Sequence, residues 1–317
     1  MRTFDKAELG RTARQYGFVR DTFEKVIRLT DILRFINKDG FLNEHLVLKG
    51  GTAINLAILN LPRLSVDIDL DYTPNDLREA MLANREQITF SLKKHMENEG
   101  YLLSSETKSR FSLDSFVYRY TNSGGNSDMI KIEINYSLRA HVLNPIAKRV
   151  LPEIFDNGDE IRMLDPVEIF AAKANALMSR AAVRDLYDFG NLIKHKLFED
   201  SRELFRKCIV FYATISAPLD KINMRFDTSA IDSITFHDIK RALFPVIKDT
   251  ANFDLKGRQE EAKAYLSNLM VLTESEKEYM SRFVSGEYRP ELLFDDPLIL
   301  DNIRNHPMPE WKIQNKY

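Results

Sequence analysis

The chain has almost no cysteine and no long apolar run. Its 317 residues include one cysteine, Cys208, which excludes an internal disulfide and the cysteine-rich zinc patterns. No apolar run approaches the roughly 18 residues that a membrane-spanning helix needs. The start of the chain, MRTFDKAELGRTARQYG, lacks the apolar region of a signal peptide. We therefore expect a cytoplasmic protein with no membrane partner.

The chain also has no excess of charge of either sign. Its 45 lysines and arginines against 47 aspartates and glutamates give a net charge of -2. This balance neither requires nor excludes a nucleic-acid partner, because a local basic face can bind phosphates on a neutral protein. The composition, 44% hydrophobic and 29% charged, is that of an ordinary globular protein and not of a disordered one.

The N-terminal half has the pattern of an α/β protein. Apolar residues at helical spacing predict a helix over 19–37, and Asn75 is a plausible N-cap for a long charged helix that reaches about residue 98. A shorter helix over 52–59 lies between strands. The strands are predicted at 46–48, 66–70, 101–105, 115–121 and 129–136, the last with strict alternation of isoleucine and polar residues.

The C-terminal half has the pattern of an all-α domain. Asp165 is the predicted N-cap of a helix with Pro166 at its first position, and this helix continues over 167–178. A second helix is predicted over 184–194, and beyond residue 200 nearly every segment has helical periodicity. We therefore predict an α/β domain over 1–150 and a helical domain over 151–317, joined near residues 144–165.

One predicted strand carries two aspartates on the same face. Asp67 and Asp69 stand one residue apart, and side chains at i and i+2 of a strand point the same way. Two carboxylates held so close are costly unless a cation lies between them. The natural occupant is a hard dication such as Mg²⁺, with the phosphate oxygens of a nucleoside triphosphate completing its shell.

A glycine turn lies between the first strand and the short helix. Its glycines can let backbone N–H groups approach a phosphate, with a threonine hydroxyl at the helix N-terminus, or they only permit a tight turn. Arg63 and Ser65 precede the aspartates, where a guanidinium could meet a triphosphate, although Arg63 is equally consistent with a surface charge. The turn consists of Lys49, Gly50, Gly51 and Thr52.

Glu133 is the candidate for a third carboxylate. It lies on the polar face of the strand at 129–136, where alternation alone also predicts a solvent-facing glutamate. Asp71 continues the series of Asp67 and Asp69, but its position at the end of the strand favours a turn residue.

A further cluster is predicted in the helical half. Lys173 interrupts an alanine-rich, apolar helix face, so it either extends to solvent or points at an anion. Asp185 and Asp188 share one face of the next helix and could hold Lys173 or Arg184 in place. A plain helical ion-pair network explains the same residues.

In this order the motifs resemble the AbiEii/AbiGii toxin family, which includes the MenT toxins. These proteins are nucleotidyltransferases of the DNA polymerase β-like superfamily, and the resemblance covers about residues 45–195. It implies a mixed twisted sheet flanked by helices, followed by an all-α C-terminal domain, with the nucleotide in the cleft between them. The motifs that carry it are Gly50-Gly51-Thr52, Arg63-x-Ser65-x-Asp67-Ile-Asp69, Glu133, Lys173 and Arg184-Asp185-x-x-Asp188.

The resemblance also implies a role for each motif. The glycine turn would lie by the phosphates, the two aspartates of the strand would hold Mg²⁺, and Glu133 matches the third carboxylate of the superfamily. Lys173 and one aspartate of the downstream segment match the family's second catalytic motif, and either Asp185 or Asp188 can be that aspartate. The gap from Gly51 to Asp67 is longer than in minimal members of the superfamily, though usual for this toxin group.

The function implied is that of a toxin in an abortive-infection type of toxin–antitoxin system. It would transfer nucleotide from an NTP to an RNA acceptor, with tRNA favoured, block translation and growth, and have a separately encoded antitoxin. Basic residues of the helical half are candidate phosphate contacts, although solvated helix faces explain each of them singly. They are Lys194-His195-Lys196, Arg202, Arg206-Lys207 and Lys240-Arg241.

Two other functions stay open. The site could modify a protein hydroxyl, as AMP-transferring relatives do. Alternatively, the fold could survive as a non-catalytic module that binds NTP or an antitoxin. Because Asp67, Asp69, Glu133 and Lys173 are all present, the inactive module ranks last.

Overall fold

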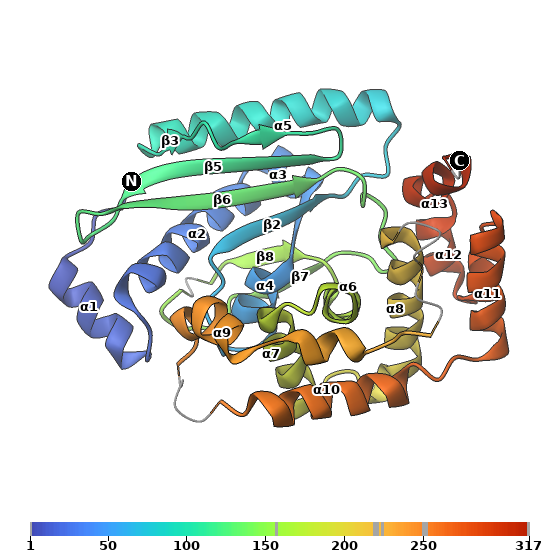
Figure 1. Ribbon diagram of the computed structural model, residues 1–317. Coiled ribbons are helices and arrows are strands. Elements are labelled where there is room, and N and C mark those ends of the chain that lie inside the picture. The colour runs from blue at the N-terminus through green and yellow to red at the C-terminus, as the bar shows by residue number, and fades with distance from the viewer. Residues whose placement is uncertain (1, 156–157, 218–221, 223–224, 249–252, 316–317) are drawn as a thin grey trace. The chain divides into compact units, whose positions relative to one another are not determined.

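The chain consists of two compact units, both drawn in Figure 1. The α/β unit comprises residues 1–139, 145–164 and 244–250, and the helical unit comprises residues 140–144, 165–243 and 251–317. The computed structural model describes residues 2–155, 158–217, 222, 225–248 and 253–315.

The α/β unit is built on a mixed eight-stranded sheet. Its strand order is β3-β5-β6-β2-β1-β8-β7, with β4 paired to β5. Strand β2 runs parallel to β6 on one side and antiparallel to β1 on the other. The strands are β1 (Leu46–Lys49), β2 (Asp67–Tyr72), β3 (Leu102–Leu103), β4 (Lys108–Ser109), β5 (Leu113–Thr121), β6 (Ser127–Asn135), β7 (Ile146–Arg149) and β8 (Glu160–Met163).

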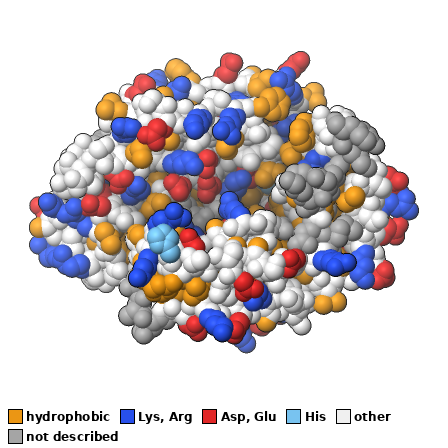
Figure 2. Space-filling view, in the orientation of Figure 1, with side chains coloured by type: hydrophobic (Ala, Val, Ile, Leu, Met, Phe, Trp, Pro, Cys, Tyr) orange, Lys and Arg blue, Asp and Glu red, His pale blue; other side chains and the backbone are white. Residues whose placement is uncertain are grey.

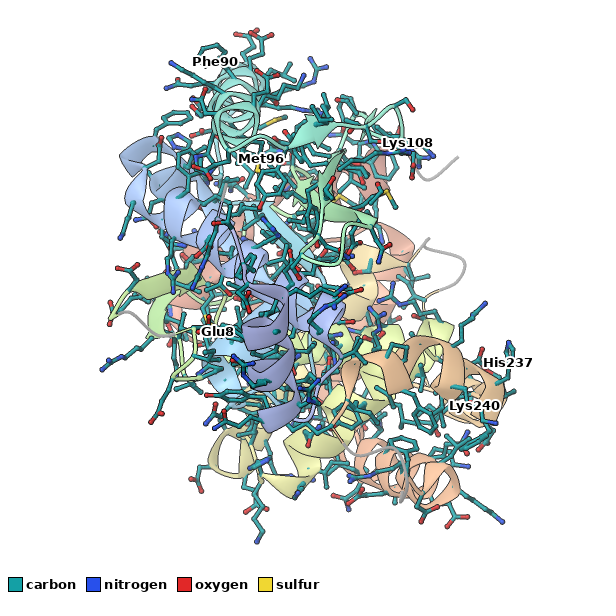
Figure 3. All side chains as sticks on the ribbon, turned by 90° about the vertical axis from the view of Figure 1, so that its left-hand side faces the viewer. Glu8, Phe90, Met96, Lys108, His237 and Lys240 are labelled. Atoms are coloured by element: carbon teal, nitrogen blue, oxygen red, sulfur yellow. The ribbon has the colours of Figure 1, made fainter. Side chains whose placement is uncertain are left out.

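Two long helices, α2 (Arg20–Lys38) and α5 (Arg78–Asn98), lie along this sheet (Figure 1). Helix α5 is amphipathic: Figure 3 shows Phe90 on its outer side and Met96 on its inner side, and these side chains are 65% and 0% exposed. The other helical elements are α1 (Lys6–Gln15), α3 (Gly40–His45), α4 (Gly50–Ala53), the π-helical turn η1 (Ile54–Ile58) and the 3-10 turn η6 (Phe244–Val246).

Alternation along β6 separates the core from a polar face of the sheet. Ile130, Ile132 and Ile134 are fully buried, whereas Lys131 and Glu133 on the opposite face are only partly buried. The apolar side chains therefore fix which face of the strand carries the polar groups, because successive residues point to opposite sides.

The first helix of the helical unit begins where the sequence predicts it. Asp165 caps α6 (Pro166–Arg180) by accepting a hydrogen bond from the Val167 N–H, and Pro166 occupies the first turn. The other helices are α7 (Val183–Lys194), α8 (Arg202–Ser216), α9 (Phe236–Asp238), α10 (Leu255–Leu269), α11 (Glu274–Ser285), α12 (Pro297–Arg304) and α13 (Pro307–Gln314). Shorter turns are η2 (Glu199–Ser201), η4 (Ser229–Ser233), η5 (Ile239–Leu243) and η7 (Pro290–Leu292).

The structure differs from the sequence-based prediction at several short elements. Strands β4, β7 and β8 were not predicted, because strands of two to four residues depend on pairing with distant partners and leave little local pattern. Strand β8 belongs to the sheet, although a cut at residue 150 assigns it to the helical half. Asn75 is not the N-cap of α5, since Leu77 holds that position. In the described part of the chain, no helix is long and apolar enough to cross a membrane.

Replacing Ile132 should destabilise the α/β unit. Its side chain is fully buried in β6, so Ile132→Ala removes apolar contacts and leaves a cavity, at a cost of about 2–5 kcal/mol in the free energy of unfolding. Met129→Ala, on the exposed face of the same strand, is the matched control and should cost less than about 1 kcal/mol. Urea denaturation measures both, and equal losses would contradict this assignment of the two faces.

Candidate active site

The carboxylates of β2 lie at the centre of the sheet's polar face. Asp67 and Asp69 point the same way, as predicted. Asp67 is opposite Lys131 on β6, and Asp69 is opposite Glu133. On the other side of β2, Asp69 is opposite Lys49 of β1. The sheet thus brings Glu133 and both aspartates into adjacent positions on one face.

The glycine turn approaches Asp69 and the Arg63 loop so closely that side chains would not fit. Gly50 has a φ of +71°, and a Cβ there would lie 2.6 Å from Oδ2 of Asp69. A Cβ at Gly51 would lie 2.7 Å from a guanidinium nitrogen of Arg63 and 2.8 Å from Oγ of Ser65. Gly50 is therefore required by its positive φ and by the close approach of Asp69, whereas Gly51 is favoured because two polar side chains lie against it.

Buried hydrogen bonds hold the turn against β2. The Thr52 hydroxyl donates to the Asp67 carbonyl at 2.5 Å. Asn55 donates from Nδ2 to the Gly51 carbonyl at 2.7 Å and accepts the Arg63 N–H at 3.2 Å. Asn55 was not among the residues predicted from the sequence. Its signal is a polar residue four positions after Gly51 on an otherwise apolar helix.

Arg63 is a buried residue and not a surface charge. Its residue exposure is 2%, and its Nη1 donates to the Leu64 carbonyl at 2.9 Å. The backbone is also fixed. Arg63 forms an isolated antiparallel β-bridge with Ile247, and the Leu64 N–H donates to the Val246 carbonyl. The interpretation of Arg63 as a solvent-exposed loop residue is therefore wrong, since Val246 and Ile247 pair with this loop.

Lys49 forms a buried ion pair with Asp71. The Lys49 Nζ lies 2.5 Å from Oδ1 of Asp71, which is 2% exposed. Burial raises the pKa of Asp71 to about 6, although Lys49 opposes the shift. Asp71 is thus part of β2 and not a turn residue, because pairing with β1 extends the strand to Tyr72. The predicted contact of Lys49 with nucleotide stays a prediction.

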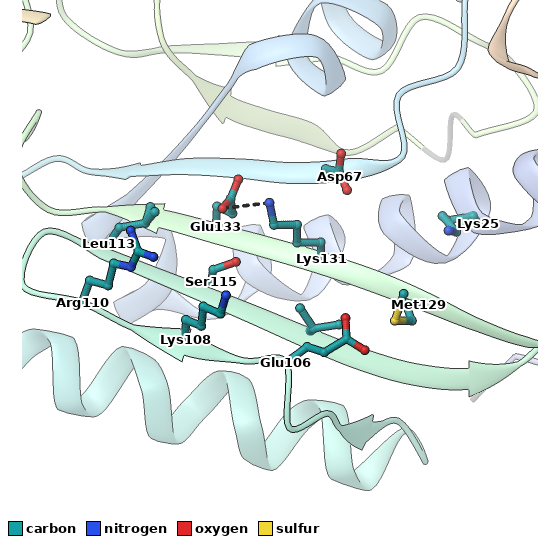
Figure 4. A pocket seen from close by; sticks show the side chains of 11 residues that line it. Lys25, Asp67, Glu106, Lys108, Arg110, Leu113, Ser115, Met129, Lys131 and Glu133 are labelled. Atoms are coloured by element: carbon teal, nitrogen blue, oxygen red, sulfur yellow. Dashed lines mark ion pairs between the residues drawn. The ribbon is translucent and has the colours of Figure 1, made fainter. Parts of the chain in front are cut away.

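Glu133 lines an open cavity on the polar face of the sheet (Figure 4). The cavity has a volume of about 560 Å³, and Asp67 also lines it. The Glu133 carboxylate pairs with Lys131 at 2.9 Å. Among the residues that the structure describes, no group of three or more His, Cys, Asp or Glu side chains is arranged to hold a metal ion.

In the helical unit, Lys173 joins both candidate aspartates. Its Nζ lies 2.6 Å from Oδ1 of Asp185 and 3.0 Å from Oδ2 of Asp188. Asp185 also pairs with Arg180 at 3.2 Å. Lys173 therefore points at anions and not to solvent, and the two carboxylates hold its ammonium group between α6 and α7.

The other predicted basic residues of the helical unit are mostly engaged. Arg184 donates from Nε to the Ala242 carbonyl at 2.9 Å. Arg206 pairs with buried Glu276, and Lys207 pairs with Glu203. Basic and acidic side chains are interspersed over the face shown in Figure 2. The charges of Arg206 and Lys207 are therefore compensated within the unit.

Glu168 anchors helix α6, which carries Lys173. The fully buried carboxylate accepts hydrogen bonds from the N–H groups of Val142 and Leu143, at 2.7 and 3.1 Å, and from the Tyr212 hydroxyl at 2.6 Å. Burial raises the pKa of Glu168 to about 7, although these donors oppose the shift. Glu168 was not predicted from the sequence, because nothing in the local pattern marks a buried glutamate.

The fold defines the class of protein. The structure resembles MenT4, a nucleotidyltransferase toxin from Mycobacterium tuberculosis H37Rv, with a TM-score of 0.64 and 16% identity over 88% of this chain and 94% of that chain. A proposed nucleotidyltransferase from H. pylori matches with a TM-score of 0.46 and 20% identity, over 78% of this chain and 95% of that chain. No curated protein sequence matches the chain. The mixed sheet flanked by helices, with the helices of the C-terminal half, is a nucleotidyltransferase toxin fold.

The family follows from the sequence itself. The family model for the nucleotidyl transferase AbiEii toxin of type IV toxin–antitoxin systems matches residues 32–277, most of the chain. The chain belongs to this family, and it is a nucleotidyltransferase. Membership implies an NTP as substrate and a separate antitoxin as partner.

Adding a side chain at Gly50 should disturb the site more than the same change elsewhere. In Gly50→Ala the new methyl group collides with the Asp69 carboxylate, in addition to the roughly 1–2 kcal/mol that a positive φ costs. Gly125→Ala is the matched control, because Gly125 has a φ of +84° but nothing within 4 Å of its Cβ position. Thermal unfolding should show a larger loss for Gly50→Ala, and equal losses would contradict the close approach.

The buried Glu168 carboxyl should make stability depend on pH. Its pKa is about 7 in the fold against an ordinary value of 4.5, so its stabilising contribution is complete below pH 4.5 and is lost as the pH rises through 7. The loss is on the order of 3 kcal/mol. Denaturation of wild type and Glu168→Gln from pH 4 to 8 measures it. The stability difference in favour of wild type should fall with rising pH, and parallel curves would contradict the assignment.

Proposed function

We propose that the protein transfers a nucleotide from an NTP to an RNA acceptor, with tRNA favoured, in a magnesium-dependent reaction. The observation that supports this most is the close approach of Gly50 to Asp69, with 2.6 Å between a Cβ position and Oδ2. The backbone of a glycine turn, which can bind phosphate, and a carboxylate, which can bind metal, share one small site.

The two aspartates of β2 suit magnesium. Asp67 and Asp69 offer hard oxygen ligands on one face of β2, and Mg²⁺ in nucleotide enzymes is typically bound by one or two carboxylates together with substrate phosphates. Asp67 and Asp69 would hold the ion, and Glu133 is the candidate third ligand. When bound, the ion would neutralise charge that develops on the phosphates.

The chain's own groups would orient the triphosphate. The backbone of Gly51 and the region around Arg63 and Ser65 would contact the phosphates. The two side chains lie against the turn, since a Cβ added at Gly51 would be within 2.8 Å of each. The Thr52 hydroxyl would act through Asp67, to whose carbonyl it donates. In the helical unit, Lys173 would contact the triphosphate and stabilise the leaving group, with Asp185 and Asp188 holding its ammonium group.

The chemical step needs no covalent enzyme intermediate. The oxygen of an acceptor hydroxyl attacks the α-phosphorus, the bond from that phosphorus to the α,β-bridging oxygen breaks, and pyrophosphate leaves. Glu133 is the candidate to accept the hydroxyl proton, because it is opposite Asp69 on the neighbouring strand. Transfer to tRNA would block translation and growth, and the antitoxin would relieve the block.

The protein is incubated with each labelled NTP, magnesium and total tRNA. Wild type should label RNA, and Asp69→Asn should lower the rate at least about 100-fold, because it removes a ligand charge at the reacting phosphates. Asp31→Asn, a carboxylate of α2 that pairs with Arg34, is the matched control and should keep wild-type activity.

The same experiment separates the competing functions. A labelled protein band without labelled RNA would support transfer to a protein hydroxyl. Magnesium-dependent NTP binding without any transfer would support a non-catalytic module. Equal labelling of RNA by wild type and Asp69→Asn would reject the assigned site.

A further inference from the structure

The cavity beside Asp67 is lined by cations that the proposed donor site does not use. Lys25, Lys108, Arg110 and Lys131 all contribute to its wall. Lys25 pairs with Asp128 at 2.7 Å, and Lys131 pairs with Glu133. Lys108 and Arg110 are exposed, and neither forms an ion pair with any residue in the described part of the chain. These two cations are therefore available to an external anion.

The turn that carries these cations is anchored from the core. Arg85 of α5 makes a bidentate pair with buried Asp114, at 2.9 and 2.6 Å. The same guanidinium donates to the carbonyls of Arg110 and Phe111, at 2.6 and 2.9 Å, and to the Ser109 hydroxyl at 2.9 Å. The backbone around Lys108 and Arg110 is thus fixed, so an anion would bind without the cost of ordering a loop.

Strand order separates this cavity from the glycine turn. Along β5-β6-β2-β1, strand β2 lies between the cavity-lining strands and β1, which leads into Gly50. Figure 4 shows Lys108 and Arg110 across the cavity from Asp67, with Lys131 on the strand next to Asp67. The carboxylates of β2 are therefore flanked by the turn on one side and by cations on the other.

We propose that Lys108 and Arg110 bind backbone phosphates of the RNA acceptor. The inference rests on the proposed function, in which the donor triphosphate lies by the glycine turn. In-line displacement requires the attacking and leaving oxygens on opposite sides of the phosphorus, so the acceptor belongs on the β6 side of Asp67 and Asp69. Lys108 and Arg110 give that side positive charge, which suits a polynucleotide backbone, because Lys131 is paired with Glu133 and Glu106 is paired with Arg119.

Compensation of the charges of Arg206 and Lys207 supports the same choice. Arg206 and Lys207, the basic pair predicted from sequence to contact phosphate, already pair with Glu276 and Glu203. Lys108 and Arg110 would bind phosphate without first breaking an ion pair with a described residue. They are better candidates for phosphate contacts than Arg206 and Lys207.

The test compares Lys108→Ala/Arg110→Ala with a matched control, Lys93→Ala/Lys94→Ala on α5, which removes the same charge. Binding of labelled total tRNA is measured from 50 to 300 mM salt, and magnesium-dependent NTP binding is measured separately. Two lost phosphate contacts should reduce the slope of log K against log salt by about 1.5 and weaken binding about 30-fold at 0.1 M salt. NTP binding and the control variant should be unchanged.

Each other outcome has a distinct meaning. Loss of NTP binding with tRNA binding intact would overturn the proposal, because the cavity would then receive the donor phosphates. Unchanged tRNA binding and salt slope in the double variant, with transfer by wild type intact, would also overturn it. Wild type that labels a protein and neither binds nor labels tRNA would contradict the proposed acceptor itself, whatever the double variant does.

Discussion

The pairing of β2 between β1 and β6 is the constraint on which the site depends. It sets Asp69 opposite Lys49 on one side and opposite Glu133 on the other. Because side chains alternate, a slip of one residue would turn the carboxylates into the core and expose Ile68. Ile68 and Ile132 are paired and fully buried, so hydrophobic burial on one face fixes the positions of the charges on the other.

Hydrogen bonds also fix the two turns beside the polar face, and losing them would reduce the stability of the fold. Asn55 joins the Gly51 carbonyl to the Arg63 N–H, and Arg85 joins Asp114 to the turn at residues 109–111. Removing either partner would leave buried polar groups unpaired, at about 1–3 kcal/mol each. The glycine turn and the turn that carries Lys108 and Arg110, on opposite sides of β2, are both fixed before any ligand binds.

Much of the fold could be predicted from local pattern. The periodicity of α2, the alternation of β6 and the Asp165-Pro166 start of α6 are strong signals, because each element is long or has a capping residue. The two-residue strand β4 has no such signal, and its pairing with β5 depends on the Arg85–Asp114 contact across 29 positions. Asn75 is not the cap because α5 begins only at Arg78, after Leu77, which forms no side-chain capping hydrogen bond.

The sequence alone determined the residues of the candidate site: two aspartates on one strand face, a glycine turn before them, and an order of motifs typical of AbiEii toxins. Only the tertiary structure decided the partner of each charge. Arg63 is buried, Asp71 forms an ion pair with Lys49, and Glu133 forms an ion pair with Lys131. Lys108 and Arg110 line the cavity beside Asp67. The physical reason is the distance along the chain between the groups involved. Alternation is set between neighbouring residues, whereas burial and ion pairing depend on groups that only the folded sheet brings together.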